Sequence, residues 1–245
     1  RWFQKGCNAM SGDGSQYVSQ QILGAGLVIA IDGPSGAGKS TIARLSAAEL
    51  GTRFLDTGAM YRALTWYALQ QGTDLNDPAA LAMLAASIPL QVEDVPHAPR
   101  VLINGRDVTA LLRSEQVTSM VSRVSAVPGV REQMIARQRQ LIKAAQESGR
   151  GIVAEGRDIT TVVAPDADVK ILLTASEQVR QQRRQGQLGV GTDAVSSRDL
   201  ADSQVNNFTT PAPGVELLDS SDLSEEETLE AVVAIVGRVF KARHA

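Results

Sequence analysis

The chain has 245 residues, of which 43% are hydrophobic and 21% are charged, a composition typical of a soluble globular protein with a substantial core. Its net charge of −3 gives no electrostatic indication of a nucleic-acid partner. The single cysteine, Cys7, excludes a disulfide within the chain and indicates a reducing, cytoplasmic setting.

Residues 1–26 differ in composition from the rest, because Gly, Ser, Gln and Asn dominate and no helical or strand period runs through them. They predict a flexible N-terminal leader, with Met10 as a candidate natural start. The apolar run 22–31 is too short to span a bilayer and leads directly into a glycine-rich loop. We therefore expect this run to be part of the fold and not a signal peptide, and we expect no membrane partner.

Short apolar runs alternate with helical segments along the remaining chain. The runs are residues 27–31, 53–55, 151–154, 169–174 and 215–218. This alternation predicts an α/β fold, a doubly wound parallel sheet with helices on both faces. We expect one domain over residues 27–245.

The glycine-rich loop, DGPSGAGKST, contains the pattern G-x-x-x-x-G-K-[ST] without a mismatch. Such glycines let backbone N–H groups surround a phosphate, Lys39 brings a positive charge to the terminal phosphates, and the Ser40 hydroxyl can bind Mg²⁺. A chance match is about a one-in-a-hundred event, and the flanking strand and helix point a helix N-terminus at the loop. The predicted ATP-binding residues are Gly33, Pro34, Ser35, Gly36, Ala37, Gly38, Lys39, Ser40 and Thr41.

A second segment, FLDTGAMYRAL, follows at the end of the second predicted strand. Thr57 and Arg62 then lie where open parallel sheets bind ligands, and an arginine there suits the phosphate of an acceptor nucleotide. The alternative is a helix N-cap at Thr57 and an ordinary surface arginine.

Residues 89–110 interrupt the alternation of strands and helices. Apolar and polar residues alternate there, and an Asn104-Gly105 pair lies between apolar residues, which is the strongest short-range signal for a β-hairpin. We expect a small antiparallel insertion on the α/β core, within about residues 83–125.

Three helix starts are marked by capping residues. Asp77 and Pro78 predict an N-cap followed by a first-turn proline. A long helix is expected after Pro128, and Ser224 with Glu227 predicts a capping box before the last helix.

Charged residues follow the buried run 151–154 directly. Glu155 is a candidate for orienting magnesium-bound water, Arg157 for holding a phosphate, and Asp158 for accepting a hydrogen bond from an amino group. Charges at a buried edge are costly unless they are paired or bind a ligand. A purely structural ion pair is the alternative.

A basic segment follows the fourth predicted strand, at about residues 180–205. It carries Arg180, Arg183 and Arg184 on one helix, then a glycine-punctuated loop with Arg198 and Asp202. This composition fits a lid that closes over a transferring phosphate and expels water. A solvated basic helix explains the first three arginines almost as well. The interpretation as a lid is therefore favoured only because the chain also has a phosphate loop.

Regulatory GTPases need D-x-x-G and N-K-x-D segments, and the sequence contains neither. A polymer-moving ATPase normally has a larger chain or a basic face. Scattered arginines instead favour small-molecule phosphoryl transfer, in which the protein positions two anions and neutralises the charge between them.

Six segments together resemble the bacterial cytidylate kinases, the CMP/dCMP kinases among the nucleoside monophosphate kinases. They are DGPSGAGKST, FLDTGAMYRAL, INGRDVT, VSRVSAVPGVRE, VAEGRDITTVVAPDADVKILLTAS and RDLADSQ. The resemblance runs from about Leu27 to the C-terminus. It implies a P-loop NTPase fold with a five-stranded parallel core, a CMP-binding insertion with a small antiparallel sheet, a short lid, and a monomer.

The resemblance also assigns roles to residues. It implies that Ser122, Arg131 and Asp158 read the base, and that Thr57, Arg62 and Arg157 hold the acceptor phosphate. Arg198 and Asp202 would engage the sugar and phosphate. Lys39, Arg180, Arg183 and Arg184 would steady the donor γ-phosphoryl group, and Ser40 would bind the metal.

One arginine of the usual lid is missing, because Val205 stands three residues after Asp202, followed by Asn206 and Asn207. Either Arg183 or Arg184 covers its role, or turnover is slower than in relatives.

The expected activity is Mg²⁺-ATP-dependent phosphoryl transfer to CMP and dCMP, in line and without a covalent enzyme intermediate. Two other hypotheses are a small P-loop kinase acting on another metabolite, and a nucleotide-binding regulatory module that has lost transfer. Val205 is the one sequence feature that favours the regulatory module.

Overall fold

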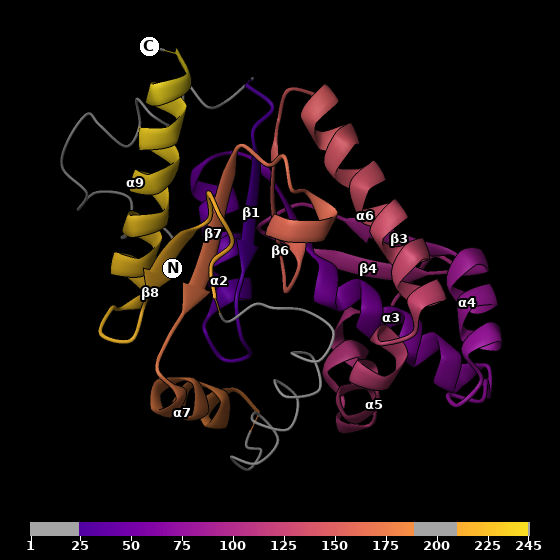
Figure 1. The fold of residues 1–245 in the computed structure, drawn as a ribbon. Coiled ribbons are helices and arrows are strands. Elements are labelled where there is room, and N and C mark those ends of the chain that lie inside the picture. The colour runs from indigo at the N-terminus through magenta and orange to yellow at the C-terminus, as the bar shows by residue number, and fades with distance from the viewer. Residues whose placement is uncertain (1–24, 189–209, 245) are drawn as a thin grey trace.

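The computed structural model describes residues 25–188 and 210–244. A parallel, five-stranded sheet has the strand order β2-β6-β1-β7-β8 (Figure 1). The strands are β1 (Val28–Asp32), β2 (Arg53–Asp56), β6 (Ile152–Gly156), β7 (Val169–Thr174) and β8 (Glu216–Asp219). Each predicted apolar run is therefore a strand, and the predicted α/β fold is confirmed.

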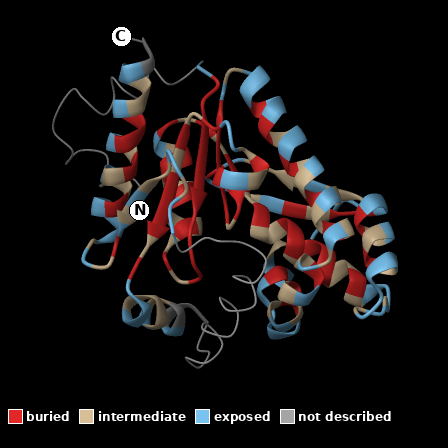
Figure 2. Cartoon of the chain, viewed as in Figure 1, coloured by how far each residue is buried: buried red, intermediate tan, exposed pale blue. Residues whose placement is uncertain are grey.

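Helices cover both faces of this sheet. These are α2 (Lys39–Glu49), α3 (Thr57–Gln70), α6 (Pro128–Glu147) and α9 (Glu225–His244), while α4 (Pro78–Ser87), α5 (Glu115–Ser125) and α7 (Glu177–Leu188) lie off the faces of the sheet. Ile29 and Ile31 of β1 pack into one core with α2 and α9, whereas Val28 and Ala30 pack into another with α3 and α6. Because both faces are covered, the central strands β1 and β6 are buried along their whole length (Figure 2) and read as continuous apolar runs, whereas the edge strand β8 stays partly exposed.

The predicted antiparallel insertion is a three-stranded sheet of β3 (Leu90–Glu93), β4 (Arg100–Ile103) and β5 (Arg106–Asp107). At its tight turn Asn104 has a φ of 52° and Gly105 a φ of 72°. Positive φ at both central residues is what a type I′ hairpin turn requires. This sheet lies beside α3 and α4, at the opposite end of the molecule from α9 (Figure 1).

The predicted helix starts are also confirmed. The Asp77 carboxylate accepts hydrogen bonds from the amides of Ala79 and Ala80, at 2.9 and 3.0 Å. The Ser224 amide donates to the Glu227 carboxylate at 2.8 Å, while the Glu227 amide donates to the Ser224 hydroxyl at 3.1 Å, which is the reciprocal pairing of a capping box. Each cap satisfies backbone donors that the first helical turn leaves open.

Gly33 directly follows β1 and has a φ of 151°, and a Cβ atom there would lie 2.0 Å from the Leu173 carbonyl oxygen of the neighbouring strand. We expect Gly33→Ala to lower the free energy of unfolding by at least about 2 kcal/mol, because the neighbouring backbone must move. Gly72→Ala is the matched control, since Gly72 has a φ of 65° with open space around it and suffers only about 1 kcal/mol of backbone strain. Equal losses in urea unfolding would contradict the steric argument.

Three parallel strands end at the same edge of the sheet, because Asp32 pairs in register with Gly156 and Asp56 with Glu155. The phosphate loop and the predicted acceptor segment both begin at this edge. Among the described residues, no helix has the length and apolar character needed to cross a membrane.

Candidate active site

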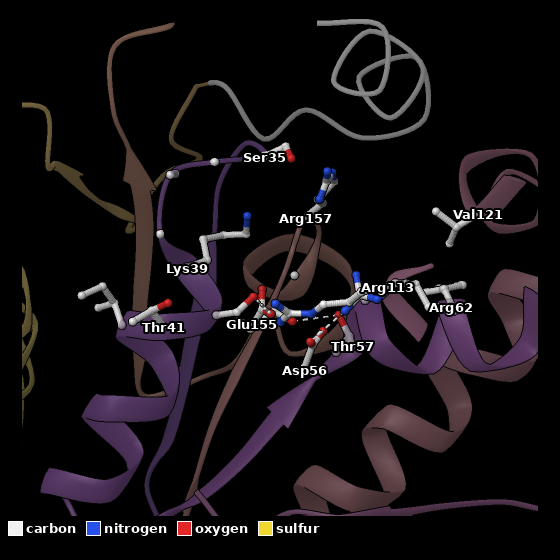
Figure 3. Close-up of a pocket in the computed structure, with 18 of the residues that line it drawn as sticks. Ser35, Lys39, Thr41, Asp56, Thr57, Arg62, Arg113, Val121, Glu155 and Arg157 are labelled. Carbon is white, nitrogen blue, oxygen red and sulfur yellow. Dashed lines mark hydrogen bonds and ion pairs between the residues drawn. The ribbon is translucent and has the colours of Figure 1, made fainter. Parts of the chain in front are cut away.

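A cavity of about 390 Å³ opens at the carboxyl edge of the sheet. The phosphate loop, residues 35–41, lines one side (Figure 3). The other side carries residues from α3, α5, α6 and the segment after β6. The cavity thus brings together these predicted residues: Ser35, Gly36, Ala37, Gly38, Lys39, Ser40, Thr41, Thr57, Arg62, Ser122, Arg131, Arg157, Asp158 and Arg183.

Lys39 lies inside the phosphate loop as the first residue of α2. Its side-chain amino group donates to the Pro34 carbonyl oxygen at 2.8 Å, and the residue is buried. This bond closes the loop on itself and keeps the positive charge at the helix N-terminus, where backbone N–H groups favour anions.

Glu155 lies at the floor of the cavity, between the phosphate loop and the start of α3 (Figure 3). Its carboxylate accepts a hydrogen bond from the Ser40 hydroxyl at 2.6 Å. Burial and the neighbouring Asp56 carboxylate raise the pKa of Glu155 to about 7, against the opposing effects of Lys39, Ser40 and Arg62. A hydroxyl and a carboxyl group side by side are oxygen ligands of the kind that Mg²⁺ prefers.

The raised pKa of Glu155 predicts a pH dependence of stability. The unfolded chain loses this proton above its ordinary pKa of 4.5, whereas the folded chain keeps it up to about 7. The folded state therefore binds more protons in this window, so the contribution of Glu155 to the free energy of unfolding falls as pH rises from 4.5 to about 7. In urea unfolding of the nucleotide-free protein, Glu155→Gln should flatten this part of the profile. An unchanged slope would contradict the assignment.

Asp56 and Arg62 form an ion pair on the acceptor side, with 2.8 Å between the guanidinium and the carboxylate. Burial opposes the charged form of Asp56, but Arg62, the Ala59 amide and Arg113 outweigh it and lower the pKa of this carboxyl group. The ion pair holds the Arg62 side chain at the cavity, where 14% of its surface remains exposed.

The structure contradicts the alternative reading of this segment. Asp56, not Thr57, is the N-cap of α3, since its carboxylate accepts from the Ala59 amide at 2.7 Å. The Thr57 hydroxyl instead donates to the Glu155 carbonyl oxygen at 2.8 Å. Thr57 thus ties the start of α3 to the end of β6 and leaves Arg62 facing the cavity.

Asp158 and Arg131 meet at the far end of the cavity. The Asp158 carboxylate accepts from the Arg131 guanidinium at 2.5 Å, and only 9% of the Asp158 side chain is exposed. Ser122 of α5 and Tyr61 of α3 line the same region. A hydroxyl, a guanidinium and a carboxylate together offer the donors and acceptors that a flat polar base needs.

Two of the predicted lid arginines contact the phosphate loop from α7. Arg180 donates to the Ser35 carbonyl oxygen at 3.1 Å, and Arg183 donates to that of Ala37 at 3.3 Å. Arg183 also donates to the Ser220 carbonyl oxygen at 2.8 Å, so it joins the loop to the end of β8.

The rest of the predicted lid lies outside the described residues. This holds for Arg198, Asp202 and Val205, and for the side chain of Arg184. The predicted leader, residues 1–26, lies outside them up to residue 24.

Sequence reasoning missed Asp32 and Arg113. The buried Asp32 carboxylate accepts from the Ile159 amide at 2.9 Å and from the Thr160 amide and hydroxyl at 2.8 and 2.6 Å. Its place directly before the phosphate loop was the available signal. Arg113 ends the 3₁₀ helix Thr109–Arg113 of the insertion and lines the cavity near Arg62 (Figure 3), a closeness that the local sequence does not indicate.

A phosphate loop at a helix N-terminus, opening on one cavity with an arginine-lined pocket, defines a nucleotide-dependent small-molecule kinase. The family model "Cytidylate kinase" matches residues 29–238, and the chain belongs to the cytidylate kinase family.

Curated relatives agree with this family. A cytidylate kinase of Streptomyces avermitilis is 45% identical over 86% of this chain and 92% of its own length. A cytidylate kinase of Rhodococcus jostii is 46% identical over 86% of this chain and 94% of its own length. A cytidylate kinase of Streptomyces griseus is 43% identical over 86% of this chain and 92% of its own length.

Proposed function

We infer that this protein transfers the γ-phosphoryl group of ATP to CMP or dCMP, giving ADP and CDP or dCDP. The observation that carries the inference is one cavity that joins the phosphate loop to the Asp158–Arg131 pair, in a chain of the cytidylate kinase family. With ATP on the phosphate loop and CMP on the acceptor side, the two phosphate groups would face each other within that cavity.

On the donor side, the phosphate loop binds the ATP phosphates through its backbone amides, and Lys39 neutralises charge on the transferring group. Ser40 and Glu155 are the residues that would hold Mg²⁺, since their oxygens lie 2.6 Å apart at the phosphate side of the cavity. When bound, Mg²⁺ supplies charge neutralisation for the donor phosphates. Arg180, Arg183 and Arg184 are the proposed lid arginines.

On the acceptor side, Arg62 and Arg157 hold the acceptor phosphate, with Thr57 at the same position. Arginine suits this task because its planar guanidinium makes paired hydrogen bonds to phosphate oxygens. Arg198 and Asp202 are proposed to engage the sugar and phosphate. The acceptor phosphate is already an anion at neutral pH, so the in-line reaction needs no general base.

The base is read by Ser122, Arg131 and Asp158. Asp158 accepts a hydrogen bond from the 4-amino group of cytosine, whereas uracil would place a carbonyl oxygen against the carboxylate. Sites that hydrogen-bond a substrate group in this way discriminate by about 10⁴-fold in favourable cases.

We propose further that residues 27–245 form one domain, with the acceptor-binding insertion at about residues 83–125 and the lid at about residues 180–205. We propose that the protein acts as a monomer, as the resemblance to the bacterial cytidylate kinases implies. The lone Cys7 supports a cytoplasmic setting.

A coupled assay of ADP release over CMP, dCMP, UMP, AMP and shikimate tests the function. We expect CMP and dCMP to be the preferred acceptors, and turnover to require Mg²⁺. Strong activity with AMP and none with CMP would refute the cytidylate assignment. Tight ATP binding without turnover on any acceptor would instead favour a regulatory module.

A further inference from the structure

Two buried polar atoms near the base-reading pair have no hydrogen-bond partner among the described residues. They are the Tyr61 hydroxyl and the side-chain nitrogen of Gln138. Tyr61 is 9% exposed and Gln138 only 1%. Buried polar groups are nearly always paired in folded proteins, so two neighbouring exceptions beside a ligand cavity require an explanation.

Tyr61 connects the cavity to Gln138. It lines the cavity together with Arg131 and Asp158. Burial and the Asp158 charge raise the pKa of Tyr61 to about 12, while the Arg131 charge and the Gln138 side chain, whose contact with the hydroxyl falls short of hydrogen-bond geometry, act in the opposite direction. All three groups therefore lie close to the Tyr61 hydroxyl, which keeps its proton at physiological pH and remains a hydrogen-bond donor.

Gln138 stands behind this hydroxyl on α6. It lies two helical turns after Arg131, with buried Met134 between them, so the three share the inner face of the helix. Gln138 does not line the cavity, and any effect on the acceptor must therefore pass through Tyr61.

We propose that Tyr61 and Gln138 are positioning residues that hold the Asp158 carboxylate in place for cytosine. In the nucleotide-free structure Asp158 is bound to Arg131. When CMP binds, Arg131 turns from Asp158 to the nucleotide. Asp158 then accepts a hydrogen bond from the Tyr61 hydroxyl, and the Tyr61 oxygen accepts one from the Gln138 amide. Both unpaired atoms then gain a partner, and Asp158 presents its remaining lone pairs to the 4-amino group.

The direction of these bonds follows from the chemistry of the groups. A glutamine NH₂ group only donates, a phenol both donates and accepts, and a carboxylate only accepts. The relay therefore runs one way and fixes Asp158 as an acceptor. This inference rests on the proposed CMP kinase activity, and it adds to that activity the residues that set the preference for cytosine over uracil.

Tyr61→Phe and Gln138→Met test the relay, since each removes the polar atoms and keeps most of the volume. We expect each variant to raise KM for CMP about tenfold, the equivalent of one hydrogen bond, and to lower the CMP-over-UMP ratio of kcat/KM by a similar factor. KM for ATP should stay within about twofold. The double variant should lose little more than either single variant, because both act on one chain of bonds.

Matched controls are Tyr67→Phe on the same helix as Tyr61 and Gln140→Met on the exposed side of α6. Both should keep the wild-type KM and base preference. Calorimetric titration of CMP without ATP gives a readout independent of turnover, and Tyr61→Phe and Gln138→Met should show the same tenfold loss of affinity there.

A packing role predicts a different pattern, namely a lower melting temperature with CMP affinity and base preference within twofold of wild type. That result overturns the inference. Should Gln138→Met fail to fold, Tyr61→Phe decides alone, since it removes a single oxygen. Wild-type protein that does not phosphorylate CMP refutes the proposed function, whereas active wild type with unaffected variants refutes only the relay.

Discussion

Asp158→Ala is expected to lower kcat/KM for CMP by about 10²- to 10³-fold, with KM for ATP within about twofold of wild type. The change removes the acceptor for the cytosine amino group and leaves the largely buried Arg131 guanidinium without its 2.5 Å ion pair. Loss of one member of a buried, hydrogen-bonded charge pair typically costs about 2–5 kcal/mol, which corresponds to this range. Steady-state assays with CMP and UMP measure it.

The same variant should lose most of its preference for CMP over UMP, because the Asp158 carboxylate is the group that repels the 4-carbonyl oxygen of uracil. Asp166→Ala removes an exposed carboxylate from the following turn and should behave as wild type. A parallel loss of ATP affinity in Asp158→Ala would mean that the residue supports the whole site and not the acceptor base.

Lys39→Met is expected to lower kcat by about 10³-fold, because it removes a preorganised positive charge from a buried position beside the transferring phosphoryl group. Methionine keeps the length and apolar stem of the side chain. Single-turnover transfer from labelled ATP to CMP measures the chemical step directly.

Lys170→Met is the matched control for Lys39. The Lys170 amino group donates to the Pro165 carbonyl oxygen at 3.1 Å, five residues back, just as Lys39 donates to Pro34. The local bond is the same, but Lys170 lies outside the cavity. A comparable loss in both variants would show that the bond to the backbone, and not the charge at the phosphate, carries the effect.

Much of the fold was predictable because local rules determine it. The doubly covered sheet demands apolar strands such as Val28–Asp32, and Asn104-Gly105 satisfies a turn that few other residue pairs tolerate. Ser224 and Glu227 cap their own helix without help from distant residues. Each of these patterns lies within a few residues of the structure that it specifies.

Local patterns predicted the site mainly where its residues follow a strand, whereas Ser122 and Arg131, which lie within helices, came only from the family resemblance. Lys39 was found from the glycine-rich motif and Asp158 from its place after a buried apolar run, and the structure brings them together because the carboxyl ends of β1 and β6 share one edge. Arg113 and Gln138 come from the insertion and from α6, and their closeness to Arg62 and Tyr61 depends on how whole elements pack. The role of Thr57 was ambiguous for the same reason, since its hydroxyl bonds a strand far away in the sequence.

Asp32 limits how this enzyme can be redesigned. It belongs to the strand that carries the phosphate loop, yet its carboxylate binds the turn at Ile159 and Thr160, directly after Arg157 and Asp158. The donor and acceptor segments are therefore not interchangeable modules. A graft of residues 157–163 from a kinase of another specificity would need to preserve a hydroxyl at position 160 and both backbone amides. Without them, the transplanted segment would meet a buried carboxylate with no hydrogen-bond donor opposite it.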